Sequence, residues 1–196
     1  MKALRQLLDE LGYDDATTFL QSGNAVLTSP KDAAQVKREL EQRIAADLGL
    51  ETEVFVRTRT ELAKVVANDP LADVVDNPSR YQVSFLQQKL PARAARELEQ
   101  AEIAPERVAV NGREIYAWHA NGIQRSPLAK LLSQSKLGVS STARNWNTVT
   151  KLLALAGDAK APAVKVSAKP AAAAKATAGH DCPRREGRVH ASRALY

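Results

Sequence analysis

The feature that most constrains this chain is an alternation of short helical and strand patterns, which fills its first 157 residues and then stops. Leucines spaced i, i+3, i+4 and i+7 between residues 4 and 11 mark one face of a first helix. Two strands joined around Ser22-Gly23-Asn24 follow, and then come a helix, a short strand and a connecting helix. Such a succession predicts an α+β fold in which helices cover one face of each sheet.

Capping residues predict the helix boundaries in this first half. Ser29 and Pro30 have the residue types of an N-cap and a first helical position, and the helix they open is expected to end at Gly49. Thr58 and Glu61 have the spacing of a capping box, which predicts that the connecting helix begins there.

The second half repeats the alternation with a strand over 81–86, a helix over 91–103, a hairpin, a helix capped by Ser126 and a last helix over about 142–156. In the hairpin, Asn111-Gly112 suits a type I′ turn, which places Val108 opposite Ile115.

These elements predict two small subdomains of the βαββαβ, ferredoxin-like kind. The N-terminal subdomain takes residues 1–70 with the connecting helix, and the C-terminal subdomain takes 71–157 and ends in a helical segment. The first would match the βαββαβ plan if one strand preceded Met1. From residue 158 no periodic apolar face is evident, so we expect a disordered tail over 158–196.

The net charge of +6 resides mainly in that tail. Residues 1–157 carry 20 basic and 19 acidic side chains, whereas residues 158–196 carry 8 basic and 3 acidic ones. A cationic tail attracts nucleic acid weakly and without sequence preference, so such contact is expected through 158–196 and not through a basic domain. After Ala178 the lysines give way to arginines, histidines and Cys182, and we infer that this end is translated out of its ancestral frame.

Composition excludes several classes of protein. A single cysteine cannot form an internal disulfide, and the three histidines have no metal-ligand spacing, so no metal or cofactor is predicted. No apolar run approaches the roughly 20 residues that span a bilayer, and the N-terminus is too charged for a signal peptide. We therefore expect a cytoplasmic protein without a membrane partner. A helix-turn-helix over 128–146 is disfavoured, because its buried positions fall on polar residues.

Several strings, in order and well spaced, resemble a known family. They are QSGN at 21–24, VRT at 56–58 with EL at 61–62, GREIYAWHANGIQRSPLAKLL at 112–132 and TARNWNTVTKLLAL at 142–155. Over about residues 1–157 the chain resembles the bacterial family called domain of unknown function 1697. The resemblance implies two α+β subdomains in a cytoplasmic protein with no established activity.

The chain departs from that family at its start. Family members resemble one another in an N-terminal strand and a glycine-rich RGINVGG-like loop, and this chain opens at what looks like an internal methionine. We therefore expect a truncated gene model or a fragment that lacks this strand. A lost strand would leave a sheet edge uncovered and favour pairing with another chain.

The predicted last helix is the first candidate for a binding site. Arg144 is expected in its first turn, beside free backbone N–H groups that favour anions, with Lys151 two turns on and Arg125 across a turn. The resemblance adds Asn145 and Asn147, which belong to the family string. The alternative interpretation is a solvated polar face with Thr142 as its cap.

The strand connection at Gln21, Ser22 and Asn24 is the second candidate, because we expect it to present amides to a ligand near the junction of the subdomains. The alternative there is ordinary turn chemistry around Gly23. His119, after a strand, is the one candidate general base, but the sequence places no partner beside it. The catalytic residues therefore stay unknown, and a structural or exposed histidine is the alternative.

Together these observations favour a binding or interaction module over an enzyme; its ligand is unknown, and an anion is the candidate. The first alternative is an enzyme that acts on an anionic small molecule held by Arg144 and Lys151. The second is non-specific association with nucleic acid through the tail.

Overall fold

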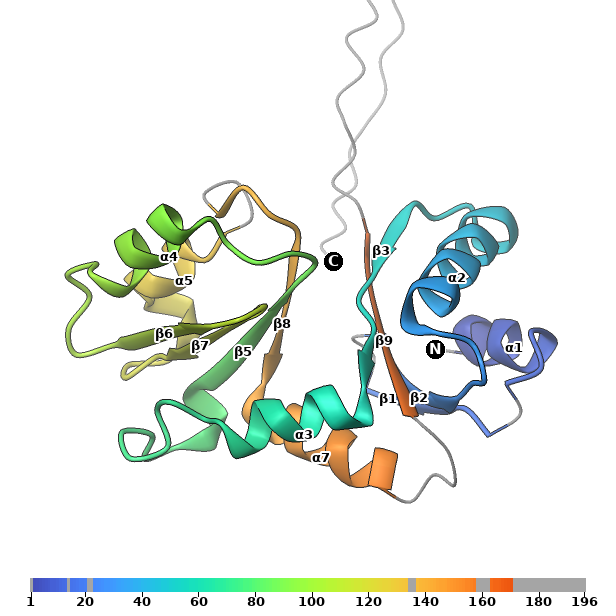
Figure 1. Ribbon diagram of the computed structural model, residues 1–196, viewed down its shortest axis with the longest axis horizontal. Coiled ribbons are helices and arrows are strands. Elements are labelled where there is room, and N and C mark those ends of the chain that lie inside the picture. Colours follow the sequence, from blue (N-terminus) through green and yellow to red (C-terminus); the bar gives the residue numbers. More distant parts are fainter. Residues whose placement is uncertain (1, 14, 21–22, 134–136, 158–162, 171–196) are drawn as a thin grey trace, which may run out of the picture.

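A computed structural model describes residues 2–13, 15–20, 23–133, 137–157 and 163–170, which form two antiparallel sheets with helices packed on them (Figure 1). The helices are α1 (Lys2–Glu10), α2 (Ala33–Leu48), α3 (Arg59–Ala67), α4 (Ala92–Glu99), α5 (Pro127–Leu131) and α7 (Trp146–Gly157), with 3-10 turns η1 (Pro78–Arg80) and η2 (Ile123–Arg125). The strands are β1 (Thr17–Phe19), β2 (Asn24–Thr28), β3 (Thr52–Val54), β4 (Arg57–Thr58), β5 (Tyr81–Leu86), β6 (Arg107–Asn111), β7 (Glu114–Trp118), β8 (Ser141–Asn145) and β9 (Ala163–Pro170). The α+β class is thereby confirmed.

The first sheet has the order β1-β2-β9-β3, with β4 also paired to β9. Helices α1 and α2 cover its outer face (Figure 1), and the leucines predicted for the first helix face inward. Ala25 and Leu27 of β2 pack on this helical layer, whereas Val26 packs on the opposite side with α3 and α7. Since alternate residues of a strand point to opposite faces, β2 is buried on both.

Helix α2 begins at Ala33, so the prediction that Ser29 caps it was wrong. Asp32 is the N-cap: its side chain accepts from the Gln35 N–H, and the Gln35 side chain accepts from the Asp32 N–H. This complete capping box outcompetes Ser29, whose hydroxyl instead accepts from the Lys31 N–H at 3.0 Å. The predicted end at Gly49, which is left-handed, is confirmed.

Strand β9 corrects the expectation that all of 158–196 lacks regular structure. It pairs antiparallel with β2 on one side, and with β3 and β4 on the other. Its sequence is Ala-Val-Lys-Val-Ser-Ala-Lys-Pro, which from Val164 onward alternates small or apolar with polar residues at a period of two. A search for an apolar helix face, which repeats every ~3.6 residues, misses this alternation. The remainder of the predicted tail lies outside the described residues.

The second sheet has the order β6-β7-β5-β8, and all its pairs are antiparallel. Helices α4 and α5 cover one face and α3 with α7 the other, so its burial on both faces corrects the expectation of one covered face. The hairpin register also differs from the prediction: Val108 lies opposite Ala117, because the turn is Gly112-Arg113. Gly112 alone has a positive φ there, which suits a type II′ turn and not type I′.

The largest difference from the predicted elements is β8, which occupies the first residues of the expected last helix. Asn145, not Thr142, precedes the helix, and its Oδ1 accepts from the Asn147 N–H at 3.0 Å. Thr142 is buried on β8 instead, where it pairs with Phe85 of β5. Both residue types cap helices well, so local preference alone could not choose between them.

Helices α3 and α7 form a layer shared by the two sheets (Figure 1). Their buried side chains, Leu62 and Val65 of α3 with Val149 and Leu152 of α7, join Val26 of the first sheet to the core of the second. Within the described residues, no helix has the length and apolar character needed to cross a membrane.

Candidate functional site

Arg144 lies on β8 and not in the first turn of a helix, so the expected neighbourhood of helix N–H groups was wrong. Its Nε donates to Asn24 Oδ1 at 2.6 Å, and its Nη1 donates to Thr142 Oγ1 at 2.8 Å and to the Ala143 carbonyl at 2.6 Å. Burial lowers the pKa of Arg144 to about 10, because it disfavours the charged guanidinium. Arg144 and Asn24 thus join the two sheets, and two predicted site residues are brought together in a structural contact.

Asn145 and Asn147 serve the start of α7. The Asn145 side-chain amide donates to the Ser79 carbonyl at 2.8 Å, and its oxygen accepts from Asn147 N–H. These contacts explain the residue types without a ligand, since asparagine is among the preferred N-caps.

The other predicted site residues are not gathered around Arg144 by any contact. Lys151 and Arg125 are exposed on α7 and η2, and neither side chain forms a hydrogen bond or ion pair with the part of the chain that the structure describes. Gln21 and Ser22 lie outside the described residues.

His119 is fully buried and has polar neighbours that the sequence did not reveal. Its Nδ1 lies 2.7 Å from Ser126 Oγ and 3.8 Å from Glu106 Oε1, while Nε2 is buried and has no hydrogen-bond partner among the residues that the structure describes. Ser126 Oγ and Glu106 Oε2 also accept from the first N–H groups of α5, those of Ala129 and Leu128. The cluster therefore anchors a helix start, and the structural alternative for His119 is the one that its burial supports.

This burial predicts a pH-dependent stability. Desolvation lowers the pKa of His119 below its ordinary value near 6.5, although Glu106 acts in the opposite direction. Below about pH 6.5, His119 is protonated in the unfolded chain but stays neutral in the folded one. The free energy of unfolding therefore falls as the pH drops below about 6.5. Urea unfolding between pH 7.5 and about 5.5 should record this loss, and His119→Asn should have a flatter profile. Equal pH slopes for the two proteins would contradict the assignment.

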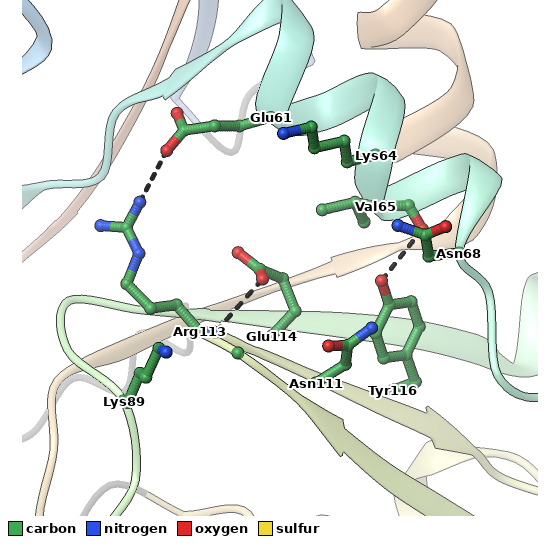
Figure 2. Close-up of a pocket in the computed structure, with 10 residues that line it drawn as sticks. Glu61, Lys64, Val65, Asn68, Lys89, Asn111, Arg113, Glu114 and Tyr116 are labelled. Atoms are coloured by element: carbon green, nitrogen blue, oxygen red, sulfur yellow. Dashed lines mark hydrogen bonds and ion pairs between the residues drawn. The ribbon is translucent and has the colours of Figure 1, made fainter.

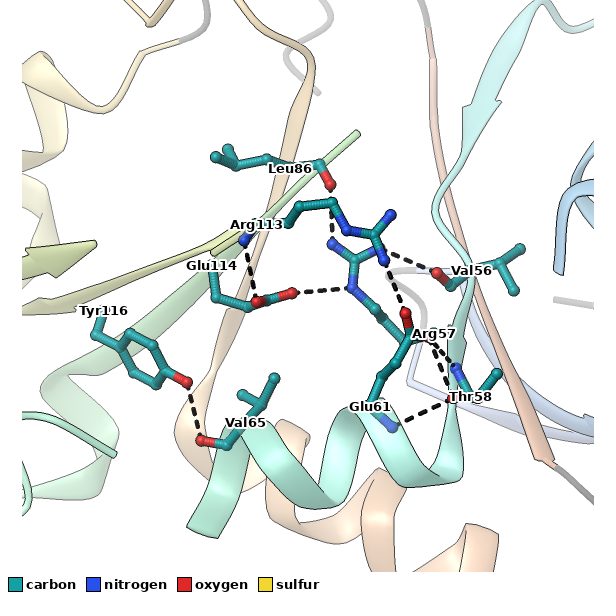
Figure 3. Close-up of polar contacts among 9 residues, drawn as sticks. All are labelled: Val56, Arg57, Thr58, Glu61, Val65, Leu86, Arg113, Glu114 and Tyr116. Carbon is teal, nitrogen blue, oxygen red and sulfur yellow. Dashed lines mark hydrogen bonds and ion pairs between the residues drawn. The ribbon is translucent and has the colours of Figure 1, made fainter. Parts of the chain in front are cut away.

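A network of charged side chains joins the first sheet to the β6–β7 turn (Figure 3). Arg57 of β4, whose side chain is 2% exposed, donates through Nε to Glu114 Oε1 at 3.0 Å and through Nη2 to the Leu86 carbonyl at 2.8 Å. Arg113 donates to Glu61 Oε1 at 2.7 Å, and Glu61 closes the capping box with Thr58. Burial lowers the pKa of Arg57, and Glu114 opposes that shift.

Beside this network lies a pocket of about 280 Å³ between α3 and the β6–β7 turn (Figure 2). Its lining residues are Glu61, Lys64, Val65, Asn68, Lys89, Asn111, Gly112, Arg113, Glu114 and Tyr116. Both carboxylates of the lining are paired with arginines, Glu61 with Arg113 and Glu114 with Arg57. Lys64 and Lys89 extend from α3 and from the loop after β5, and neither ammonium group pairs with a described residue.

Only a few parts of this pocket could be predicted from the sequence. The Thr58–Glu61 capping box was predicted and is confirmed. Pairing of Glu61 with Arg113 joins residues 52 positions apart, and no spacing rule relates them. The signal that was present is the charged turn Gly112-Arg113-Glu114, which was interpreted only as a hairpin connection.

Comparisons with known proteins address the family and the fold. A solved structure described as that of conserved bacterial protein SP0830 from Streptococcus pneumoniae matches with a TM-score of 0.60 at 19% identity, over 81% of this chain and 89% of that one. It supports the fold alone. No curated protein matches the sequence. The family model described as a protein of unknown function (DUF1697) matches residues 1–116, so the chain belongs to the DUF1697 family.

Proposed function

We propose that the protein is a binding module for a small anionic molecule, held in the pocket between α3 and the β6–β7 turn. One observation carries the proposal: both carboxylates that line the pocket are neutralised by arginines, whereas Lys64 and Lys89 have no partner among the described residues. The pocket therefore has an excess of positive charge available to a ligand.

The lining supplies suitable groups for a compact oxyanion. Lys64 and Lys89 offer ammonium donors from two different walls, and Asn68 and Asn111 add side-chain amides (Figure 2). Ammonium groups bind phosphate and carboxylate oxygens through charge-assisted hydrogen bonds, which are about twice as strong as neutral ones. Small phosphate esters and small carboxylic acids are the ligand class that fits this arrangement.

Acid–base chemistry is less well supported than binding. Glu61 and Glu114 are held in ion pairs. The Tyr116 hydroxyl donates to the Val65 carbonyl at 2.9 Å, and burial raises the pKa of Tyr116. An enzyme acting on an anionic substrate is the alternative function, and a cytoplasmic location stays a prediction.

A thermal-shift titration with inorganic pyrophosphate tests the proposal at constant ionic strength. A ligand at ten times its dissociation constant stabilises the folded state by about 1.4 kcal/mol, or about 3–5 °C in Tm for a chain of this size. We expect Lys64→Gln/Lys89→Gln to abolish the shift, because it removes both unpaired ammonium groups while keeping amide donors.

Lys130→Gln is the matched control, since Lys130 is an exposed lysine of α5 outside the pocket. It should retain the full shift. Lys151→Gln separates this pocket from the site predicted at α7. A shift that survives in the double variant and disappears with Lys151→Gln would refute the pocket and favour α7.

A further inference from the structure

The central position of β9 in the first sheet carries a separate inference about assembly. Strand β2 pairs with β1 and β9, and β3 and β4 each pair with β9; in the described part of the chain, β2 has no pairing with β3 or β4. The two halves of the sheet are therefore joined only through an inserted strand. Without β9, two facing strand edges would present unpaired backbone N–H and C=O groups.

Strand β9 also comes last along the described chain. The strands on either side of it are complete by residue 58, whereas β9 begins at Ala163, and five residues separate it from Gly157 at the end of α7. Every other pairing in both sheets can therefore form without it. Only the short connection 158–162 fixes which molecule supplies this strand.

From this placement we propose that the slot between β2 and β3/β4 is an acceptor for an exchangeable strand, and that residues 163–170 of a second copy fill it in a strand-swapped dimer. The swapped and unswapped forms make identical pairings: five residue pairs with β2, three with β3 and two with β4. Because these contacts cancel, protein concentration and the geometry of the connection decide between the forms. Strand addition of this kind obtains its affinity from main-chain hydrogen bonds.

A second copy is the occupant that the register specifies. The register between β2 and β9 is defined residue by residue, from Thr28 opposite Ala163 to Asn24 opposite Ser167. Lys165 and Lys169 lie between the apolar residues of the segment, and such charges discourage indiscriminate aggregation of a free strand. The same eight residues therefore satisfy the slot in cis and in trans.

Disulfide trapping between two differently labelled chains tests the exchange. One full-length chain carries Thr28→Cys and the other Ala163→Cys, both with Cys182→Ser, and they are refolded together from urea in a glutathione redox buffer. Opposed residues of an antiparallel pair have Cα atoms about 4.5–5.5 Å apart, within the span of a disulfide. We expect a cross-linked heterodimer on a non-reducing gel, with a yield that rises with protein concentration.

Two further chains make the outcome decisive. Ala109→Cys on β6 of the second sheet replaces Thr28→Cys as the control, and it should give no heterodimer above background. A single chain with Thr28→Cys/Ala163→Cys/Cys182→Ser reports pairing in cis. An intramolecular disulfide at every concentration, with no heterodimer, would overturn the exchange, and the absence of both disulfides would overturn the β2–β9 pairing on which it rests.

Discussion

Replacing Glu114 with glutamine is expected to lower the free energy of unfolding by about 3 kcal/mol, one of the two largest effects that the structure predicts. The glutamine keeps a hydrogen-bonding group near Arg57 but removes the charge that neutralises it. Arg57 is 2% exposed and Glu114 16% exposed, so the guanidinium would remain buried without a counter-ion. Urea unfolding followed by far-UV circular dichroism measures the loss.

The matched control is Glu97→Gln, which breaks the exposed pair of Arg93 and Glu97 on α4. A solvated pair of this kind is worth about 0.2–1 kcal/mol, so this variant should stay close to the parent protein. Combining Arg57→Met with Glu114→Gln should recover part of the lost stability, because no unpaired charge is then buried. Equal effects of Glu114→Gln and Glu97→Gln would contradict the buried network.

Replacing Val166 with proline is expected to lower the free energy of unfolding by about 3 kcal/mol or more. The loss of protection should be limited to the first sheet. Val166 lies opposite Ala25 in the middle of β9, and β9 has partners on both sides. Proline removes a backbone N–H, and its ring is poorly tolerated in a central strand. Hydrogen exchange should therefore accelerate in β2, β3 and β4, while β5 and β7 keep their protection.

Val166→Ile serves as the comparison, because it keeps the N–H and the β-branched shape that favours strands. It should leave the exchange of β2 unchanged. If Val166→Pro also leaves the protection of β2 and β3 intact, then residues 163–170 do not form the central strand of that sheet.

The elements that the sequence predicted well are those defined by strong local signals. Gly49 ends α2, Thr58 and Glu61 cap α3, and Ser126 with Pro127 opens α5, as expected. Each depends on contacts between residues a few positions apart. Such signals survive in the folded protein because nothing distant competes with them.

The predictions that failed are those in which tertiary pairing chose between two acceptable local structures. Residues 141–145 have the types of a helix start, but pairing with β5 makes them a strand. The β6–β7 turn lies one residue later than predicted, and in the observed structure Glu114, the first residue after it, pairs with Arg57. Strand β9 was missed because its alternation covers few residues and its partners end more than a hundred residues earlier.

In the candidate site, too, the tertiary contacts could not be predicted from local sequence signals. Arg144 and Asn24 were selected separately from the sequence, and the fold does bring them together, but as a contact between the two sheets. Lys64 and Lys89 were not selected, because isolated lysines carry no motif. Their importance depends on the neutralised carboxylates around them, which only the folded arrangement defines.

The most direct test of the anion-binding pocket is a crystal structure of the protein soaked with tungstate, a heavy oxyanion that anomalous scattering locates without ambiguity. We expect the strongest anomalous peak to lie in the pocket between Lys64 and Lys89 and to disappear in crystals of Lys64→Gln/Lys89→Gln. A strongest peak beside Arg144 or Lys151, with none in the pocket, would contradict the proposed site.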